Sequence, residues 1–147
     1  MAPARRWAEV GWKGTLEEGR GSFTVGSWMV GEVPVTWSSR TSPKEESTSP
    51  EELMAAAHAS CYATALTLVL GERGTPPESI DGQAACTLDQ VSEGFRITTM
   101  NLDVRGRDPE LDAESFQQAV EQVDQICPVS NALKDNVEIR VNTTLED

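Results

Sequence analysis

The first forty residues alternate short apolar stretches with glycines. Trp12, Phe23 and Trp37 belong to runs in which apolar and polar side chains take turns, which is the pattern of a strand with one buried face. Glycines separate these runs, at positions 14, 19, 21, 26 and 31, and favour turns between them. We predict a meander of three strands over residues 7–37. The polar stretch 38–49, which contains Pro43, is predicted to be a surface loop.

A long helix is predicted to follow this loop. Ser49 is a suitable N-cap, Pro50 suits the first helical position, and Glu52 stands where its side chain can reach back to the cap. The helix is expected to begin at residue 50. It should run to about Leu70, because glycines follow at positions 71 and 74.

The rest of the chain mixes strands with further helices. Two strands joined by a tight turn are predicted first, then two helices, and finally a closing strand. Their expected ranges are 79–90 and 94–105 for the strands, 112–125 and 128–133 for the helices, and 136–145 for the last strand. Helices that separate groups of hairpin-linked strands define an α+β fold rather than a doubly wound sheet. We expect residues 1–147 to form one domain.

The long helix has no charged face that would suit exposure to solvent. From Leu53 to Leu70 it contains no Asp, Glu, Lys or Arg. A membrane span is disfavoured because Ala, Ser, Thr and His fill half of this stretch and acidic residues crowd its entrance. Such a helix must instead be covered by protein nearly all round. We therefore expect an intertwined homodimer with the long helices buried at its centre.

Composition and charge exclude several classes of function. The 147 residues carry 12 basic and 24 acidic side chains, a formal net charge of −12, which argues against binding to nucleic acid or to an anionic membrane. No apolar segment follows Arg5 and Arg6 as in a secretion signal, so a cytoplasmic location is expected. No glycine-rich phosphate loop and no zinc-type spacing occur. We predict neither a cofactor nor a metal.

Three cysteines remain as candidate chemistry, and their odd number and wide spacing do not fit a disulfide framework. Cys61 lies three residues after His58 on one helix face, where a buried, inert thiol is the simplest interpretation. Cys127 precedes Pro128 at a predicted helix start, a position that favours the thiolate. Cys86 belongs to a strand pattern and is interpreted as structural.

Several motifs together resemble one known family. They are Pro50-Glu51-Glu52-Leu53, Ala-Ala-His-Ala-Ser-Cys at residues 56–61, and Cys-Pro-Val-Ser at residues 127–130. With the glycine-rich start and the loop that contains Arg40, these resemble the OsmC/Ohr family of thiol peroxidases, its OsmC branch in particular. The resemblance covers about residues 7–145 and implies the family's fold, in which antiparallel strands surround a long buried central helix, and its intertwined homodimer.

The resemblance also implies a reaction and its residues. Cys61 would be the peroxidatic cysteine that reduces an organic hydroperoxide to an alcohol, and Cys127 would resolve the product into a disulfide. An external thiol, such as the lipoyl groups that the Ohr branch uses or another dithiol, would then reduce that disulfide. Arg40 and Glu51 would match the family's arginine and glutamate. The expected role is detoxification under oxidative or osmotic stress.

Physical chemistry adds conditions to these implied roles. Cys61 lies beyond the first helical turn, so a lowered pKa there needs a nearby cation, which Arg40 can supply. Glu51 is ten residues before Cys61 on the helix, ~15 Å along its axis, and cannot touch it. Glu51 either orients Arg40 or serves the site of the partner chain. An apolar pocket would favour bulky organic hydroperoxides over hydrogen peroxide.

Two other functions remain open from the sequence. A hydrolase could use His58 as the base for Cys61, which requires a third group that orients the histidine. A protein that binds an apolar small molecule and keeps its thiols inert is the non-enzymatic alternative.

Overall fold

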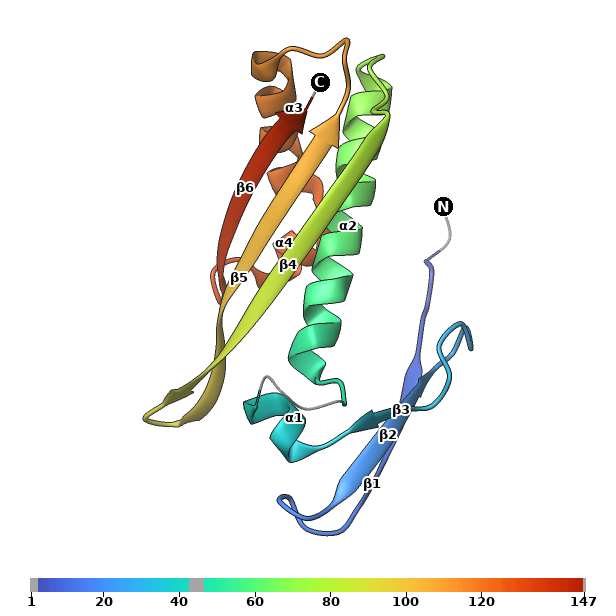
Figure 1. Ribbon diagram of the computed structural model, residues 1–147, viewed down its shortest axis with the longest axis vertical. Helices are drawn as coiled ribbons and strands as arrows, with labels where there is room; N and C mark the ends of the chain where they lie inside the picture. Colours follow the sequence, from blue (N-terminus) through green and yellow to red (C-terminus); the bar gives the residue numbers. More distant parts are fainter. Residues whose placement is uncertain (1–2, 43–46, 147) are drawn as a thin grey trace. The chain divides into compact units, whose positions relative to one another are not determined.

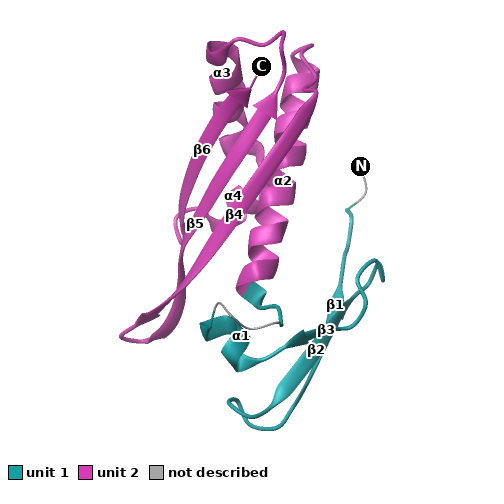
Figure 2. Cartoon of the chain, in the orientation of Figure 1, with its two compact units in different colours: residues 1–50 teal, residues 51–147 magenta. Residues whose placement is uncertain are grey.

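The computed structural model describes residues 3–42 and 47–146. The chain divides into two compact units, residues 1–50 and residues 51–147 (Figure 2). The expectation of one domain over the whole chain stays a prediction.

The first unit is built on a three-stranded antiparallel sheet in the order β1-β2-β3. Its strands are β1 (Ala8–Lys13), β2 (Arg20–Val25) and β3 (Val33–Val35). The turn between β1 and β2 needs its glycines: Gly14 has φ +95°, and a Cβ on Gly19 would lie 2.3 Å from the carbonyl oxygen of Thr15. The predicted three-stranded meander is confirmed.

The loop predicted for residues 38–49 is wrong at its beginning. A short helix, α1 (Trp37–Thr41), occupies that part. The Thr36 hydroxyl accepts a hydrogen bond from the Ser39 backbone N–H, and the Ser39 hydroxyl accepts one from the Thr36 backbone N–H. This reciprocal capping satisfies two donors at the helix start and outweighs the polar composition that favoured a loop. Pro43 and the residues to position 46 lie outside the described residues.

The second unit contains a mixed sheet whose one face is covered by helices (Figure 1). Its elements are α2 (Pro50–Glu72), β4 (Ser79–Val91), β5 (Gly94–Arg107), α3 (Ala113–Ile126), α4 (Pro128–Leu133) and β6 (Glu138–Glu146). The α+β class is as predicted, and α2 begins at the predicted Pro50. It continues to Glu72 because Gly71 is accommodated in the helix. The chain turns at Gly74, which has φ +81°.

The direction of the last strand differs from the sequence prediction. β4 and β5 form an antiparallel hairpin, whereas β6 pairs in parallel with β5. A parallel neighbour requires a crossover connection, and α3 and α4 provide it. The expected antiparallel pairing therefore applies to the first five strands and not to β6.

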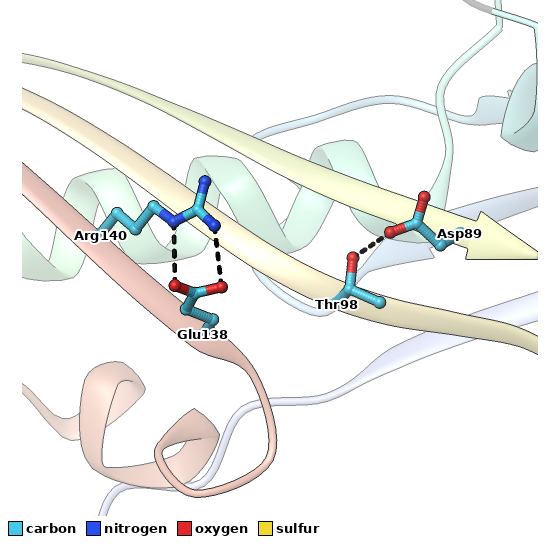
Figure 3. Close-up of polar contacts among 4 residues, drawn as sticks. All are labelled: Asp89, Thr98, Glu138 and Arg140. Atoms are coloured by element: carbon cyan, nitrogen blue, oxygen red, sulfur yellow. Dashed lines mark hydrogen bonds and ion pairs between the residues drawn. The ribbon is translucent and has the colours of Figure 1, made fainter. Parts of the chain in front are cut away.

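Polar pairs on the strands of this sheet lie at its surface (Figure 3). The Thr98 hydroxyl of β5 donates a hydrogen bond to Asp89 of β4. On β6, Arg140 and Glu138 form an ion pair with an N–O distance of 2.9 Å, and both side chains are 60% exposed. Exposed pairs of this kind contribute little to stability, so the stability of the unit depends on its core.

The core of the second unit lies between α2, the sheet and α3. It is a single cluster of buried apolar side chains, and Tyr62, Leu66 and Leu70 of α2 are fully buried in it. Leu102 and Val104 come from β5, and Phe116 and Val123 come from α3. These positions on α2 follow helical spacing, so one face of the helix is covered within the chain.

The other face of α2 is exposed in the single chain although it carries no charge from Leu53 to Leu70. Leu53 and Leu68 are 41% and 55% exposed. Among the described residues, α2 is the one helix with the length and hydropathy that a membrane span needs. Within its apolar 18-residue segment, 33% of the residues are buried inside the chain.

A close approach between β5 and α3 predicts the effect of one substitution. A Cβ on Gly106 would lie 2.8 Å from Phe116 Cε1 and 3.3 Å from Ile80 Cδ1. We expect Gly106→Ala to lower the free energy of unfolding by about 1–3 kcal/mol, because the buried ring must shift. Gly82→Ala is the matched control, since the nearest atom to its Cβ is 3.7 Å away. Equal denaturation midpoints for the two variants would contradict the prediction.

Candidate active site: a pair of cysteines between two helices

Cys61 and Cys127 lie side by side in the second unit. Their Sγ atoms are 3.2 Å apart although 66 residues separate them in the sequence. Cys61 is in the middle of α2 and is partly buried, and Cys127 is fully buried. A disulfide bond has an S–S length near 2.05 Å, so the two sulfurs need to approach by only about 1 Å to form one.

The local sequence explains the position of Cys127. Its backbone is extended, with φ −62° and ψ 115°, because the residue before a proline is disfavoured in the helical region. α3 therefore ends at this residue, and α4 begins at Pro128, which needs no N–H at a first helical position. The Cys-Pro pair turns the chain between two helices and leaves the sulfur beside α2.

A second pair of side chains joins the same two helices. His58 Nε2 lies 2.7 Å from the Ser130 Oγ. His58 is fully buried and Ser130 is 6% exposed. Each of these residues is three positions from a cysteine, His58 before Cys61 and Ser130 after Cys127. The cysteine pair and the histidine-serine pair are therefore successive contacts between one face of α2 and the start of α4.

The surroundings of Cys61 in this unit favour the protonated thiol. Burial raises the pKa of the Cys61 thiol, and its contact with Cys127 raises that pKa further. A hydrogen bond from the Val129 backbone N–H to the sulfur acts in the opposite direction and lowers the pKa. The second unit thus provides one group that stabilises the thiolate, and that group belongs to the first turn of α4.

His58 does not have the environment of a catalytic base. Its Nε2 is bonded to Ser130, and its Nδ1 has no hydrogen-bond partner among the described residues, so neither ring nitrogen is hydrogen-bonded to the Cys61 sulfur as a base would be. Burial lowers the pKa of its imidazole and favours the neutral form. The described residues therefore do not give the hydrolase alternative a base that is hydrogen-bonded to Cys61.

The lowered pKa of His58 predicts how stability depends on pH. A folded-state pKa below the unfolded value contributes stability that is present above the unfolded pKa, here 6.5, and is lost as the pH falls through the folded pKa. We expect the free energy of unfolding of the wild type to decline below pH 6.5 more steeply than that of His58→Gln, by at most about 1.4 kcal/mol per pH unit. Urea titrations between pH 5 and 8 measure both slopes, and parallel slopes would contradict this.

Arg40 lies in the first unit, on α1. Its guanidinium stacks over the Trp37 ring, 5.7 Å from the ring centroid, a cation–π contact. Arg40 also lines a largely apolar pocket of about 350 Å³ in that unit. The other residues that line this pocket are Trp12, Leu16, Val35, Thr36, Trp37 and Pro50.

Glu51 and Cys86 take no part in the contact between Cys61 and Cys127. Glu51 is buried in the first turn of α2, on the same uninterrupted helix as Cys61 and ten residues before it. Burial raises the pKa of the Cys86 thiol, and the charge of Glu51 raises it further. Cys86 is half-buried in β4, opposite Met100 of β5. Glu51 thus acts electrostatically on Cys86, whereas the thiol that contacts Cys61 is Cys127.

Sequence reasoning missed the role of Ser130. The spacings His-x-x-Cys and Cys-x-x-Ser are both visible in the sequence, and equal spacings on two helices indicate two parallel contacts. The contact between His58 and Ser130 was not predicted. No three His, Cys, Asp or Glu side chains gather as metal ligands in the described parts of the chain.

Fold and site together define a protein with a buried dithiol held between two helices of an α+β unit. Comparison with known proteins identifies its family. The family model described as OsmC-like protein matches residues 43–142, and the chain belongs to this family. The resemblance noted in the sequence motifs is confirmed.

Individual relatives agree with this assignment. Peroxiredoxin OsmC of Escherichia coli is 39% identical over 123 residues, which cover 84% of this chain and 85% of the relative. Organic hydroperoxide resistance protein OhrB of Bacillus subtilis is 36% identical over 95 residues, 64% of this chain and 68% of that protein. These names give the family a peroxidase-type role.

Solved structures share the fold. The organic hydroperoxide resistance protein OsmC of Legionella pneumophila has a TM-score of 0.76 at 19% identity, over 99% of this chain and 100% of that one. The crystal structure of Bacillus subtilis OhrB has a TM-score of 0.73 at 24% identity, over 93% and 97% of the two chains. The predicted OsmC/Ohr fold is therefore correct.

Proposed function

We propose that this protein is a thiol peroxidase that reduces organic hydroperoxides through a disulfide between Cys61 and Cys127. The observation that carries the proposal is the 3.2 Å separation of the two Sγ atoms in a chain whose family has a peroxidase-type role. Two thiols at this distance need little movement to become a disulfide. A pair of inert structural cysteines would not need to lie so close together.

The proposed reaction has three steps. The Cys61 thiolate attacks the O–O bond of the hydroperoxide; a sulfenic acid forms on Cys61, and the alkoxide that leaves takes up a proton to become the alcohol. The Cys127 sulfur then attacks the Cys61 sulfur, and the sulfenic hydroxyl leaves as water with the thiol proton. An external thiol, such as a lipoyl group or another dithiol, reduces the disulfide and is itself oxidised.

Arg40 is proposed to supply the cation that Cys61 needs. Burial works against the Cys61 thiolate, so a positive charge is required to lower the pKa of that thiol. Arg40 combines a permanent charge with an apolar pocket, which suits a substrate that has a polar hydroperoxide group and an apolar body. Glu51 is proposed to orient Arg40 or to serve the site of the partner chain.

The homodimer is proposed because of the uncovered face of α2. Its hydroxyl side chains bond to their own helix: Ser60, Thr64 and Thr67 donate to backbone carbonyl oxygens of Ala56, Ser60 and Ala63. These groups therefore require nothing from water. Together with Leu53 and Leu68 they leave a face that a second copy of α2 can cover.

The cytoplasm is the proposed location of the protein, and detoxification under stress is its proposed role.

The deciding experiment is mass spectrometry of tryptic peptides after one equivalent of an organic hydroperoxide. A Cys61–Cys127 crosslink is expected in the wild type. Cys127→Ser should retain a sulfenic acid at residue 61, and Cys61→Ser should show neither product. An apolar-ligand protein, the non-enzymatic alternative, would keep both thiols reduced and would bind its ligand equally well without Cys61.

Substrate preference provides an independent prediction. The specificity constant, kcat/KM, for cumene hydroperoxide is expected to exceed that for hydrogen peroxide by about tenfold or more, because a small hydrophilic peroxide gains nothing from apolar walls. Steady-state assays with the same dithiol reductant measure both constants. Equal constants would count against an apolar substrate pocket.

A further inference from the structure

The start of α4 is attached to α2 at three successive points. Cys127 Sγ meets Cys61 Sγ, the Val129 N–H donates to the Cys61 sulfur, and Ser130 Oγ meets His58 Nε2. The first two contacts involve the sulfur that is proposed to react. The third does not, and it is a short contact of 2.7 Å between two buried polar groups.

We infer that His58 and Ser130 are positioning residues, whose hydrogen bond holds the first turn of α4 so that Cys127 and the Val129 N–H are both directed at Cys61. This inference rests on the Cys61–Cys127 disulfide of the proposed function. It assigns the pair no contact with substrate and no proton transfer.

The geometry favours positioning over chemistry for this pair. His58 is fully buried, its Nε2 is engaged by Ser130, and Nδ1 has no partner among the described residues. A fully buried imidazole that is not hydrogen-bonded to the thiol cannot act efficiently as the general base for it. The hydrogen bond instead fixes a helix of only six residues, which is too short to be held by its own backbone bonds.

Fixing α4 matters because disulfide formation depends on how often the Cys127 sulfur lies within reach of the Cys61 sulfur. Holding two groups in reacting geometry removes the entropic cost of bringing them together. Ser130 is next to Val129 and three residues from Cys127, so releasing its hydroxyl loosens both groups that face Cys61. Removing one partner of a buried hydrogen bond leaves the other partner desolvated and unsatisfied, so the His58–Ser130 bond is an interaction that can hold this turn.

The first test is the equilibrium between the Cys61–Cys127 dithiol and its disulfide in glutathione buffers, measured on the full chain by thiol alkylation and mass spectrometry. Ser130→Ala is expected to lower the equilibrium constant for disulfide formation about tenfold, which corresponds to about 30 mV for a two-electron couple. Ser130→Thr, which keeps a hydroxyl, should recover most of the loss.

Tyr62→Phe is the matched control. It removes a hydrogen bond of 2.8 Å from the Tyr62 hydroxyl to Asp124, which joins α2 to α3 rather than to α4. This variant should keep the equilibrium constant within about twofold of the wild type. An equal change in Tyr62→Phe and Ser130→Ala would overturn the inference, because the loss would then reflect a generally loosened core.

The second test is the pH profile of Cys61 alkylation in a Cys127→Ser background, so that residue 127 has no competing thiol. Loosening the Val129 N–H should move the midpoint of thiolate formation to higher pH in the Ser130→Ala version. A purely structural loss would leave that midpoint unchanged. If Ser130→Ala does not fold, as judged by circular dichroism, His58→Leu replaces it and is expected to show the same two effects.

The outcomes separate this inference from the proposed function. A wild type that forms no Cys61–Cys127 disulfide at any glutathione ratio defeats both. A wild type that forms the disulfide, with Ser130→Ala matching it in both equilibrium constant and alkylation midpoint, defeats the positioning role alone. A lowered constant together with a raised midpoint, recovered by threonine, supports it.

Discussion

Replacing Cys61 with serine is expected to lower kcat/KM for an organic hydroperoxide by roughly 10³-fold or more. A serine hydroxyl is hardly ionised at neutral pH and cannot form a sulfenic acid, so the first step of the proposed reaction is lost. The helix should be unaffected, because serine is similar in size and can bond to its own backbone as Ser60 does.

The control for this prediction is Cys86→Ser, which removes the third thiol. Cys86 is on β4 and takes no part in the contact between Cys61 and Cys127, so its loss should change kcat/KM by less than about twofold. Peroxidase assays on the two purified variants, with circular dichroism to check folding, make the comparison. Retention of a tenth of wild-type activity in Cys61→Ser would defeat the proposed role of that cysteine.

Leu66→Ala is expected to have the largest effect on stability. Leu66 is fully buried in the core between α2, the sheet and α3. Removing its side chain loses the transfer free energy of the buried atoms and leaves a cavity, and such substitutions cost about 2–5 kcal/mol. Urea unfolding monitored by circular dichroism measures the loss as a lower midpoint at unchanged slope.

Leu68→Ala is the matched control on the same helix. Leu68 is 55% exposed in the single chain, and its position two residues on lies on the opposite side of α2. At low protein concentration this variant should lose less than about 1 kcal/mol. If the protein is the proposed homodimer, the free energy of unfolding that Leu68→Ala loses should grow with protein concentration, because dimer contacts then add to stability. A loss in Leu66→Ala as small as that in Leu68→Ala would contradict the described core.

Local patterns predicted most of the secondary structure, for identifiable reasons. Pro50 marks the start of α2, and Asp112 precedes α3, where its side chain accepts a hydrogen bond from the Ser115 backbone N–H. Both are short-range signals. The helix at Trp37–Thr41 was missed because its capping pair, Thr36 and Ser39, occurs in a stretch whose polar composition also suits a loop.

The candidate site was predictable only in part. The motifs around Cys61 and Cys127 indicate the family, and the family implies that the two cysteines cooperate. The sequence also suggested that Cys127 has the more favourable charge environment, while the roles of the two sulfurs followed from the resemblance alone. The partner of His58 was not predicted: the equal spacings around the two cysteines are visible in the sequence, but they cannot by themselves establish a contact across 72 residues.

The sequence by itself determined that the chain builds an α+β fold around an uncharged helix, and that two of its cysteines occur in recognisable motifs. Periodicity, caps and prolines act within a few residues, so they can be read along the chain. Tertiary structure alone decided that β6 runs parallel to β5, that the two sulfurs lie 3.2 Å apart, and that Ser130 faces His58. These contacts depend on how α3 and α4 return the chain to α2, and that return is set by the packing of the whole core.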